Sequence, residues 1–313
     1  MSDSSKALVK LALKKLNYSQ NQLAEMLGVS ASQISKWKNH DEYISREYED
    51  KLKEACDIGL VSAELILRFG SKENAFEWDK LFRMLAENAQ ENNETSYNCP
   101  QLMDYDVCDI SLKISNILDE LGVNLPQEMP KHLQEDNDDL FEDKYVKIIS
   151  DIFESFTALD GFFHAYFQEL GKNDDIFENL MEIEETLLNF AACKIDIDTE
   201  LAPNLRNYKY TWLKEYREAI DKIKYKAICA NLPLREELMS LIDAEIGELS
   251  AAAEREAFGF NKRQIHPDIY MNEVIMGMRA IHVVLPEIMK KLNIKIDPNI
   301  EKKSKKINRK KKL

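Results

Sequence analysis

The sequence predicts an all-α protein, with an N-terminal five-helix helical domain followed by a larger helical-bundle body. Glycine and proline are scarce, with 9 and 8 among 313 residues, a composition typical of helical proteins. Apolar residues recur every three or four positions along most of the chain, and no alternating run is long enough for a sheet. With 44% hydrophobic residues, the chain can bury a sizeable core in two or three domains.

The segment 19–39, SQNQLAEMLGVSASQISKWKN, contains two short helical patterns separated by Gly28. Each begins with a serine followed three residues later by a glutamine, which is the capping-box pattern. We expect the inward faces to be formed by Leu23, Ala24, Leu27, Ile34 and Trp37. The outward face of the second helix is polar without acidic residues, and consists of Ser32, Gln33, Ser35, Lys36 and Lys38. This pattern predicts a helix-turn-helix whose second helix is free to enter a DNA major groove.

Residues 17–39 resemble the Cro and lambda-repressor-like (XRE) family in their Ser-Gln start, Leu-Ala pair, turn glycine and Ile-Ser-x-Trp. The resemblance extends over residues 5–70, with further helices expected at 5–16, 45–56 and 62–69. It implies duplex DNA as the partner. The implied DNA-binding residues are Gln20 at a phosphate, Ser30, Ser32, Gln33 and Lys36 at base edges, and Lys38 on the same face.

Two features of this region weaken the predicted DNA contact. Ala31 offers only a methyl group where the family places contact residues, and the following segment 40–50, HDEYISREYED, is acidic. We therefore expect a monomer to bind DNA modestly. A helix-turn-helix that serves only protein contact is the alternative.

The predicted body begins after Gly70. Residues 71–123 form a connecting helical segment: a helix capped by Ser71 with Phe76, Leu81, Phe82 and Leu85 on one face, then a helix at 104–121. A proline-containing acidic stretch at 122–143 marks the main boundary. Residues 144–300 form an effector or oligomerisation domain, with helices from Lys144, from a cap at Asn173, and near 204–230, 233–257 and 268–293. Pro286 is expected to kink or break the last helix, and 301–313 is a basic, disordered tail.

The net charge of −14 is unevenly spread along the chain. Residues 1–70 are balanced, the tail carries +7, and residues 71–300 carry −21. An acidic body repels nucleic acid, so any contact must come from local patches. The tail either binds nucleic acid electrostatically or keeps the chain in solution, and both interpretations stay open.

The island 206–226 is the basic patch of the body, with a net charge of +4 and interleaved aromatic residues. Such a pattern suits stacking on unpaired bases. We expect Tyr208, Trp212 and Tyr216 to form a partly exposed stripe. The candidate nucleic-acid or partner patch consists of Arg206, Tyr208, Lys209, Trp212, Lys214 and Arg217. The alternative is a packed helix whose aromatics face the core while its lysines reach solvent.

The sequence contains no catalytic signature. Gly-rich phosphate loops, H-E-x-x-H and G-x-S-x-G are missing, and the histidines share no metal-ligand spacing. We therefore predict no catalytic residue, no metal and no cofactor, and favour a function other than an enzyme's. His164 is expected in the core with a backbone partner, and Glu178, Glu182 and Glu185 on a solvated acidic face.

Five cysteines without a C-x-x-C pair predict reduced thiols and a cytoplasmic protein. No apolar run approaches membrane-spanning length, and the N-terminus lacks the pattern of a signal peptide. No membrane contact is therefore expected.

Two functional hypotheses follow. The first is a DNA-binding protein of a bacterial or phage regulatory system, acting as a homo-oligomer because paired half-sites require two reading helices. The second is an effector toxin of a retron or toxin–antitoxin anti-phage defence system. The chain is similar, in layout alone, to the helix-turn-helix accessory proteins encoded beside retron reverse transcriptases. That resemblance implies a reverse transcriptase or an RNA–DNA hybrid molecule as partner of the helical body.

Overall fold

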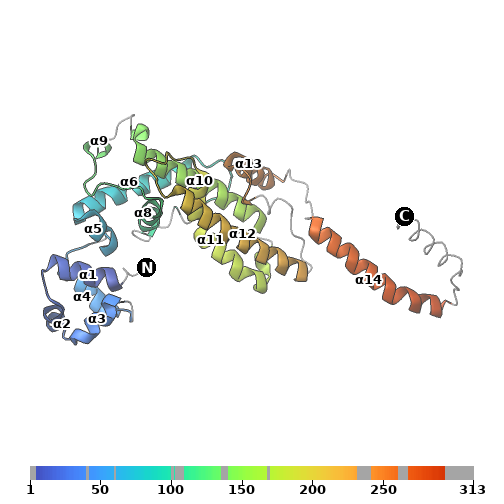
Figure 1. Ribbon diagram of the computed structural model, residues 1–313, viewed down its shortest axis with the longest axis horizontal. Coiled ribbons are helices and arrows are strands. Elements are labelled where there is room, and N and C mark those ends of the chain that lie inside the picture. Colours follow the sequence, from blue (N-terminus) through green and yellow to red (C-terminus); the bar gives the residue numbers. More distant parts are fainter. Residues whose placement is uncertain are drawn as a thin grey trace.

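The computed structural model describes a helical protein, and its described part contains no strand. Five small helices gather at one end, a bundle of long helices forms the middle, and one long helix extends from the far end (Figure 1). The all-α prediction is confirmed. The described residues are 5–39, 42–59, 61–99, 102, 109–134, 140–167, 170–230, 241–259 and 267–292. The predicted basic tail, 301–313, lies outside them.

The N-terminal region contains the five predicted helices. They are α1 (Ser5–Lys15), α2 (Gln20–Leu27), α3 (Ala31–Asn39), α4 (Arg46–Ala55) and α5 (Ala63–Phe69). Helix α1 is the central one, since it packs against the other four. Its buried face consists of Ala7, Leu8, Val9, Leu11 and Ala12. Ser5 Oγ also accepts a hydrogen bond of 2.9 Å from the amide of Ile44, which fixes the segment after α3 to α1.

A continuous aromatic cluster joins this region to the body. Gly70 ends α5 with a left-handed φ of 81°, which favours glycine, and Ser71 caps α6 (Lys72–Glu91). Across this junction Phe69 stacks on Trp78 with 5.5 Å between ring centroids, and Phe82 lies against both. All three rings are buried. The core of the N-terminal helices therefore continues into the body.

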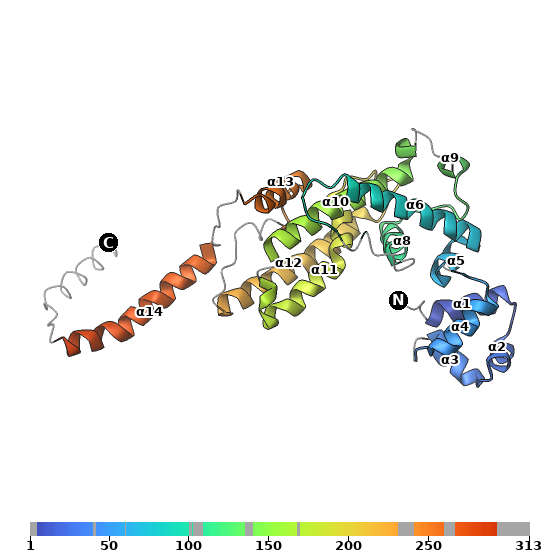
Figure 2. The same ribbon diagram turned by 180° about the vertical axis from the view of Figure 1, so that it is seen from behind.

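The body is a bundle built around α10. Its helices are α6, α8 (Asp109–Leu121), α10 (Lys144–Phe167), α11 (Asp174–Lys194), α12 (Leu205–Ala230) and α13 (Ile246–Ala257), with the short α9 (Lys131–Gln134) at its edge. Helix α10 packs against α6, α11 and α13, as both views show (Figure 2). The apolar stripe predicted for α10 is buried in full: Ile148, Ile152, Phe156, Leu159, Phe163 and Phe167. Asn173 caps α11 as predicted.

Two body predictions were wrong in detail. Phe76 is 54% exposed, because the buried stripe of α6 runs through Ala75, Trp78 and Phe82, one position away from Phe76. The helix expected at 233–257 begins only at Ile246 where the chain is described, since residues 241–245 form a turn. Residues 231–240 lie outside the described part.

Helix α10 contains an ion pair between a partly exposed histidine and a buried aspartate. His164 Nδ1 is 2.9 Å from the backbone oxygen of Asp160 and 3.4 Å from its carboxylate, and Asp160 is completely buried. Hydrogen bonding to Asp160 raises the pKa of His164 to about 9, against the opposing effect of burial. The predicted backbone partner is confirmed, but the imidazole is only partly buried and does not lie in the core.

Helix α14 (Pro267–Lys291) stands apart from the bundle and makes its main contact with α12 (Figure 1). It continues through Pro286, which was expected to kink or break it. Large apolar side chains are exposed along its length: Val274, Ile275, Met278, Ile281, Val283, Val284, Leu285 and Ile288. None of the helices in the described ranges is long and apolar enough to cross a membrane.

Candidate nucleic-acid interface

Local sequence explains why α2 and α3 are separate helices. Ser19 caps α2 by accepting from the Gln22 amide, and the Gln22 side chain accepts from the Ser19 amide at 2.8 Å, so the capping box is confirmed. Gly28 ends α2 with a φ of 71°, and its amide donates to the carbonyls of Ala24 and Glu25. This left-handed turn allows α3 to begin three residues later at an angle to α2.

Helix α3 is held by one apolar face. Ile34 is fully buried and Trp37 is 3% exposed, as predicted. The Trp37 ring also contacts Tyr48 of α4 with 5.3 Å between centroids. These contacts fix the rotation of α3 about its axis, and therefore decide which residues face outward.

The outward face carries the predicted DNA-binding side chains. Ser30, Ser32 and Lys36 are exposed, whereas Gln33 and Lys38 are half-buried. Gln20 lies half-buried at the first position of α2. All six predicted residues thus lie on the two helices of the motif or directly before α3.

An acidic side chain engages this face. Gln33 Nε2 donates to Glu42 Oε2 at 2.7 Å, and Lys36 Nζ lies 2.5 Å from Glu42 Oε1. The hydrogen bonds from Gln33 and then Lys36 lower the pKa of Glu42. The second capping box is therefore only half formed: Ser30 Oγ accepts from the Gln33 amide at 3.1 Å, but the Gln33 side chain turns to Glu42. The acidic composition of 40–50 was the signal in the sequence for this contact.

The aromatic stripe predicted on α12 is buried. Tyr208 and Tyr216 are 5% and 2% exposed, and the Tyr216 ring stacks on Phe190 with 4.2 Å between centroids. Their hydroxyls donate to the Asn189 carbonyl and to Thr186 Oγ1. Burial raises the pKa of both tyrosines. Tyr208 cannot stack on a base in this arrangement, and the expectation of an exposed stripe was wrong for both tyrosines.

The other patch residues divide between structural and exposed positions. Trp212 is half-buried between Tyr208 and Tyr216, and its Nε1 donates to Glu120 at 3.3 Å. Lys209 Nζ donates to the Ile195 carbonyl at 2.8 Å. The side chains that do reach solvent are Arg206, Lys214, Arg217 and Tyr210, the last 74% exposed.

Tyr210 is one of the interleaved aromatic residues of the island, but the predicted patch did not include it. Its signal is spacing, since Arg206, Tyr210 and Lys214 are four residues apart and share one helix face. This face is partly neutralised, because Lys214 lies 3.8 Å from Glu218 and Arg217 lies 3.5 Å from Asp243.

Metal binding and cysteine-based catalysis have little support in the described part of the chain. It contains no group of three or more histidine, cysteine or acidic side chains placed to hold a metal ion. Cys56, Cys99 and Cys193 are free and buried, and Cys229 is free and exposed. Burial raises the pKa of the first three thiols, so they do not resemble activated nucleophiles.

Comparison with known proteins identifies the N-terminal motif. Residues 9–47 match the family model described as Helix-turn-helix. The matched segment runs from α1 to the start of α4 and includes the outward face of α3. No curated protein and no solved structure matches the chain. The chain therefore contains, in its N-terminal region, a DNA-binding helix-turn-helix motif of the Cro and lambda-repressor-like type.

Proposed function

We propose that the protein is an oligomeric regulator of a bacterial or phage system that binds duplex DNA through α3. The observation that carries this proposal is the division of α3 into a buried apolar face and an outward face of Ser32, Gln33 and Lys36. Glutamine bonds adenine edges in the major groove, and lysine bonds guanine. Gln33 and Lys36 each contact one oxygen of the Glu42 carboxylate, which supports the proposal that together they can hold an anionic group such as a phosphate.

A mobility-shift experiment with a pool of genomic fragments at low salt tests this proposal. We expect selected fragments to bind in a salt-dependent manner, because phosphate contacts release counterions. Footprinting of the selected fragments should then show paired half-sites. If no fragment of the pool binds, α3 does not serve as a DNA-reading helix.

In this proposal the regions have different roles. Residues 1–70 bind DNA, 71–123 connect, and 144–300 support assembly. Two copies are needed because a single helix-turn-helix covers one half-site. The surface that best suits association with a second copy is the exposed apolar side of α14.

The apolar residues of α14 follow a heptad. These exposed residues are spaced alternately four and three apart: Val274, Met278, Ile281, Leu285 and Ile288 on the helix, and Leu292 directly after its end. A 3.5-residue repeat keeps one seam facing a partner helix in a coiled coil. The same seam on a second copy provides a matching surface. Pro286 follows the seam residue Leu285, so its ring lies outside the seam.

Light scattering on the full chain tests this assembly. We expect a dimer at micromolar concentration, and a monomer for Ile281→Asp with Leu285→Asp. Val283→Asp is the matched control, because Val283 is 72% exposed on the same helix but lies off the seam. A monomeric wild-type protein, or a control variant that dissociates equally, would contradict the proposal that the chain dimerises through this seam.

The exposed face of α12 favours a second candidate, an effector of a retron or toxin–antitoxin defence system. Arg206, Tyr210, Lys214 and Arg217 offer positive charge and one aromatic ring to a reverse transcriptase or an RNA–DNA hybrid. Growth arrest on expression, relieved by Arg206→Glu with Lys214→Glu, would support the effector. Unchanged growth on expression, together with repression of a nearby promoter, would support the regulator.

A further inference from the structure

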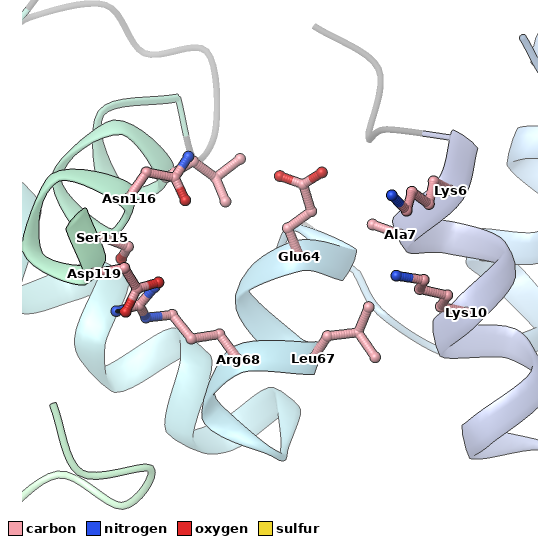
Figure 3. A pocket seen from close by; sticks show the side chains of 10 residues that line it. Lys6, Ala7, Lys10, Glu64, Leu67, Arg68, Ser115, Asn116 and Asp119 are labelled. Atoms are coloured by element: carbon pink, nitrogen blue, oxygen red, sulfur yellow. Dashed lines mark hydrogen bonds and ion pairs between the residues drawn. The ribbon is translucent and has the colours of Figure 1, made fainter. Parts of the chain in front are cut away.

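A cleft of about 630 Å³ lies where the N-terminal helices meet the body. One wall is α1, the opposite wall is α8, and α5 forms the floor between them (Figure 3). Small-molecule sites usually range from about 300 to 1,000 Å³. The size of the cleft therefore suits a compact ligand rather than a macromolecule.

The α1 wall presents two positive charges. Lys6 and Lys10 are one helical turn apart, both exposed, and both side chains extend into the cleft (Figure 3). Among the described residues, neither ammonium group is paired with a carboxylate. The acidic group of the opposite wall, Asp119, is engaged by Arg68, whose Nη2 donates to Asp119 Oδ1 at 2.6 Å. Lys6 and Lys10 therefore bring positive charge to a cleft in which Glu64, on the floor, is the carboxylate not engaged by Arg68.

The α8 wall holds a buried hydroxyl without a partner. Ser115 lines the cleft, is 1% exposed, and its Oγ has no hydrogen-bond partner in the described part of the chain. Buried polar groups in folded proteins are almost always hydrogen-bonded, since leaving one unsatisfied is costly. Beside it stands the exposed amide of Asn116, and the Glu64 carboxylate rises from the floor (Figure 3). This side of the cleft therefore offers acceptors and an amide to hydroxyl or amino groups.

We propose that the cleft binds a small phosphate-bearing molecule of mononucleotide size. Its phosphate lies against Lys6 and Lys10, because lysine is a compact point charge for phosphate. Its sugar or base groups bond Glu64, Asn116 and Ser115. A bare inorganic phosphate would satisfy the lysines and leave the α8 wall unused.

The position of the cleft connects this ligand to DNA binding. Helix α1 packs directly on α3, and α8 packs on α6, α11 and α12 of the body. A ligand held by Lys6 on one wall and Asn116 on the other bridges the two regions. Occupancy therefore fixes the orientation of α3 relative to the body, and changes affinity for paired half-sites through that orientation.

Calorimetric titration of the full chain tests ligand binding directly. The probes are the four ribonucleoside monophosphates, their nucleosides and inorganic phosphate. We expect one saturable site for at least one monophosphate, with its nucleoside and inorganic phosphate at least about tenfold weaker. Lys6→Gln with Lys10→Gln should weaken the monophosphate at least about tenfold. Lys14→Gln, on the same helix but outside the cleft, is the matched control and should bind like wild type.

A second measurement keeps the inference separate from the proposed DNA contact. Ser115→Ala should retain the melting temperature and weaken the monophosphate severalfold. Duplex affinity is then measured with and without the bound monophosphate. Ligand binding that persists while duplex binding fails would overturn the proposed function and leave the cleft intact. If no monophosphate binds while the double lysine variant loses duplex affinity, the lysines contact DNA phosphates and the ligand proposal is overturned.

Discussion

Helices α3 and α12 both carry the residue types of a nucleic-acid surface, but they use them differently. On α3 a single aromatic, Trp37, is buried, and the polar residues remain outside. On α12 the rings of Tyr208 and Tyr216 are in the core, and their hydroxyls find partners on α11. Interleaved basic and aromatic residues are therefore evidence for a nucleic-acid surface only when the aromatics lie off the apolar stripe.

Helix geometry explains why the stripe of α12 turns inward. Steps of four residues advance about 40° around a helix, and steps of three return about 60°. The two steps from Tyr208 to Tyr216 therefore advance about 80°, the step to Ala219 returns about 60°, and the step to Ile223 advances about 40°, so all four residues stay on one side. All four are buried. The aromatic and aliphatic residues of α12 therefore share one buried side, which is why the predicted partly exposed stripe is not formed.

The largest effect should come from truncating a buried ring of α12. Tyr216→Ala should cost about 3–5 kcal/mol of unfolding free energy, because it removes a large packed side chain and leaves a cavity. Tyr210→Ala is the matched control on the same helix, and its 74% exposed ring should change stability by less than about 0.5 kcal/mol. Urea unfolding measures both. Similar losses for the two variants would show that α12 is rotated from the orientation described.

On α3 we expect a loss of DNA binding without a loss of stability. Lys36→Ala should weaken binding to a selected duplex by about 1–3 kcal/mol if Lys36 reads a base, while the melting temperature stays unchanged. Lys80→Ala, an exposed lysine on α6, is the control for general charge. An equal loss of duplex affinity in both variants would show that Lys36 contributes only non-specific charge.

The pH dependence of stability should report on the pair of His164 and Asp160 in α10. The folded chain holds a proton on His164 up to a pH of about 9, whereas an unfolded histidine releases it near 6.5. Stability contributed by the pair with Asp160 is therefore fully present below pH 6.5 and is lost as the pH rises to about 9.

The expected loss is about 1–2 kcal/mol, reduced from the full shift because the imidazole is partly exposed. Urea unfolding across this range measures it, and His164→Gln should flatten the profile. A wild-type profile that rises with pH would contradict the pair. Burial raises the pKa of the facing Glu184, so Glu184→Gln is the control that separates its titration from that of His164.

The smallest effect should come from Glu42. Glu42→Gln removes a carboxylate beside the DNA-reading face and frees Gln33 and Lys36 for a ligand. Duplex affinity should rise about threefold at low salt, and the gain should shrink as salt screens the charge. Glu47→Gln provides the control, since Glu47 pairs with Lys51 on α4 instead. A loss of affinity would mean that Glu42 positions Lys36 for binding.

The predictable parts of the fold are those decided by local chemistry. The cap at Ser19, the glycine at 28 and the three-four spacing of α10 each act within a few residues, and all were predicted correctly. The contact of Glu42 with Lys36 depends on how the segment after α3 folds back. The acidic composition of that segment indicated a contact with the outward face, but it did not identify Glu42 and Lys36 as the two partners. The burial of Tyr208 depends on where α11 lies, which no pattern within α12 encodes. The cleft was unpredictable for the same reason, since Lys6 and Ser115 meet only through tertiary packing.

The aromatic cluster at Phe69, Trp78 and Phe82 has a consequence for how the protein melts. Phe69 belongs to the N-terminal region and the other two rings belong to the body, so neither region can unfold without exposing the other's rings to water. Heating the whole chain should therefore give cooperative loss of both regions in one calorimetric peak. A chain cut after Gly70 would leave Phe69 without its stacking partners and melt at a lower temperature than the same helices do within the whole protein.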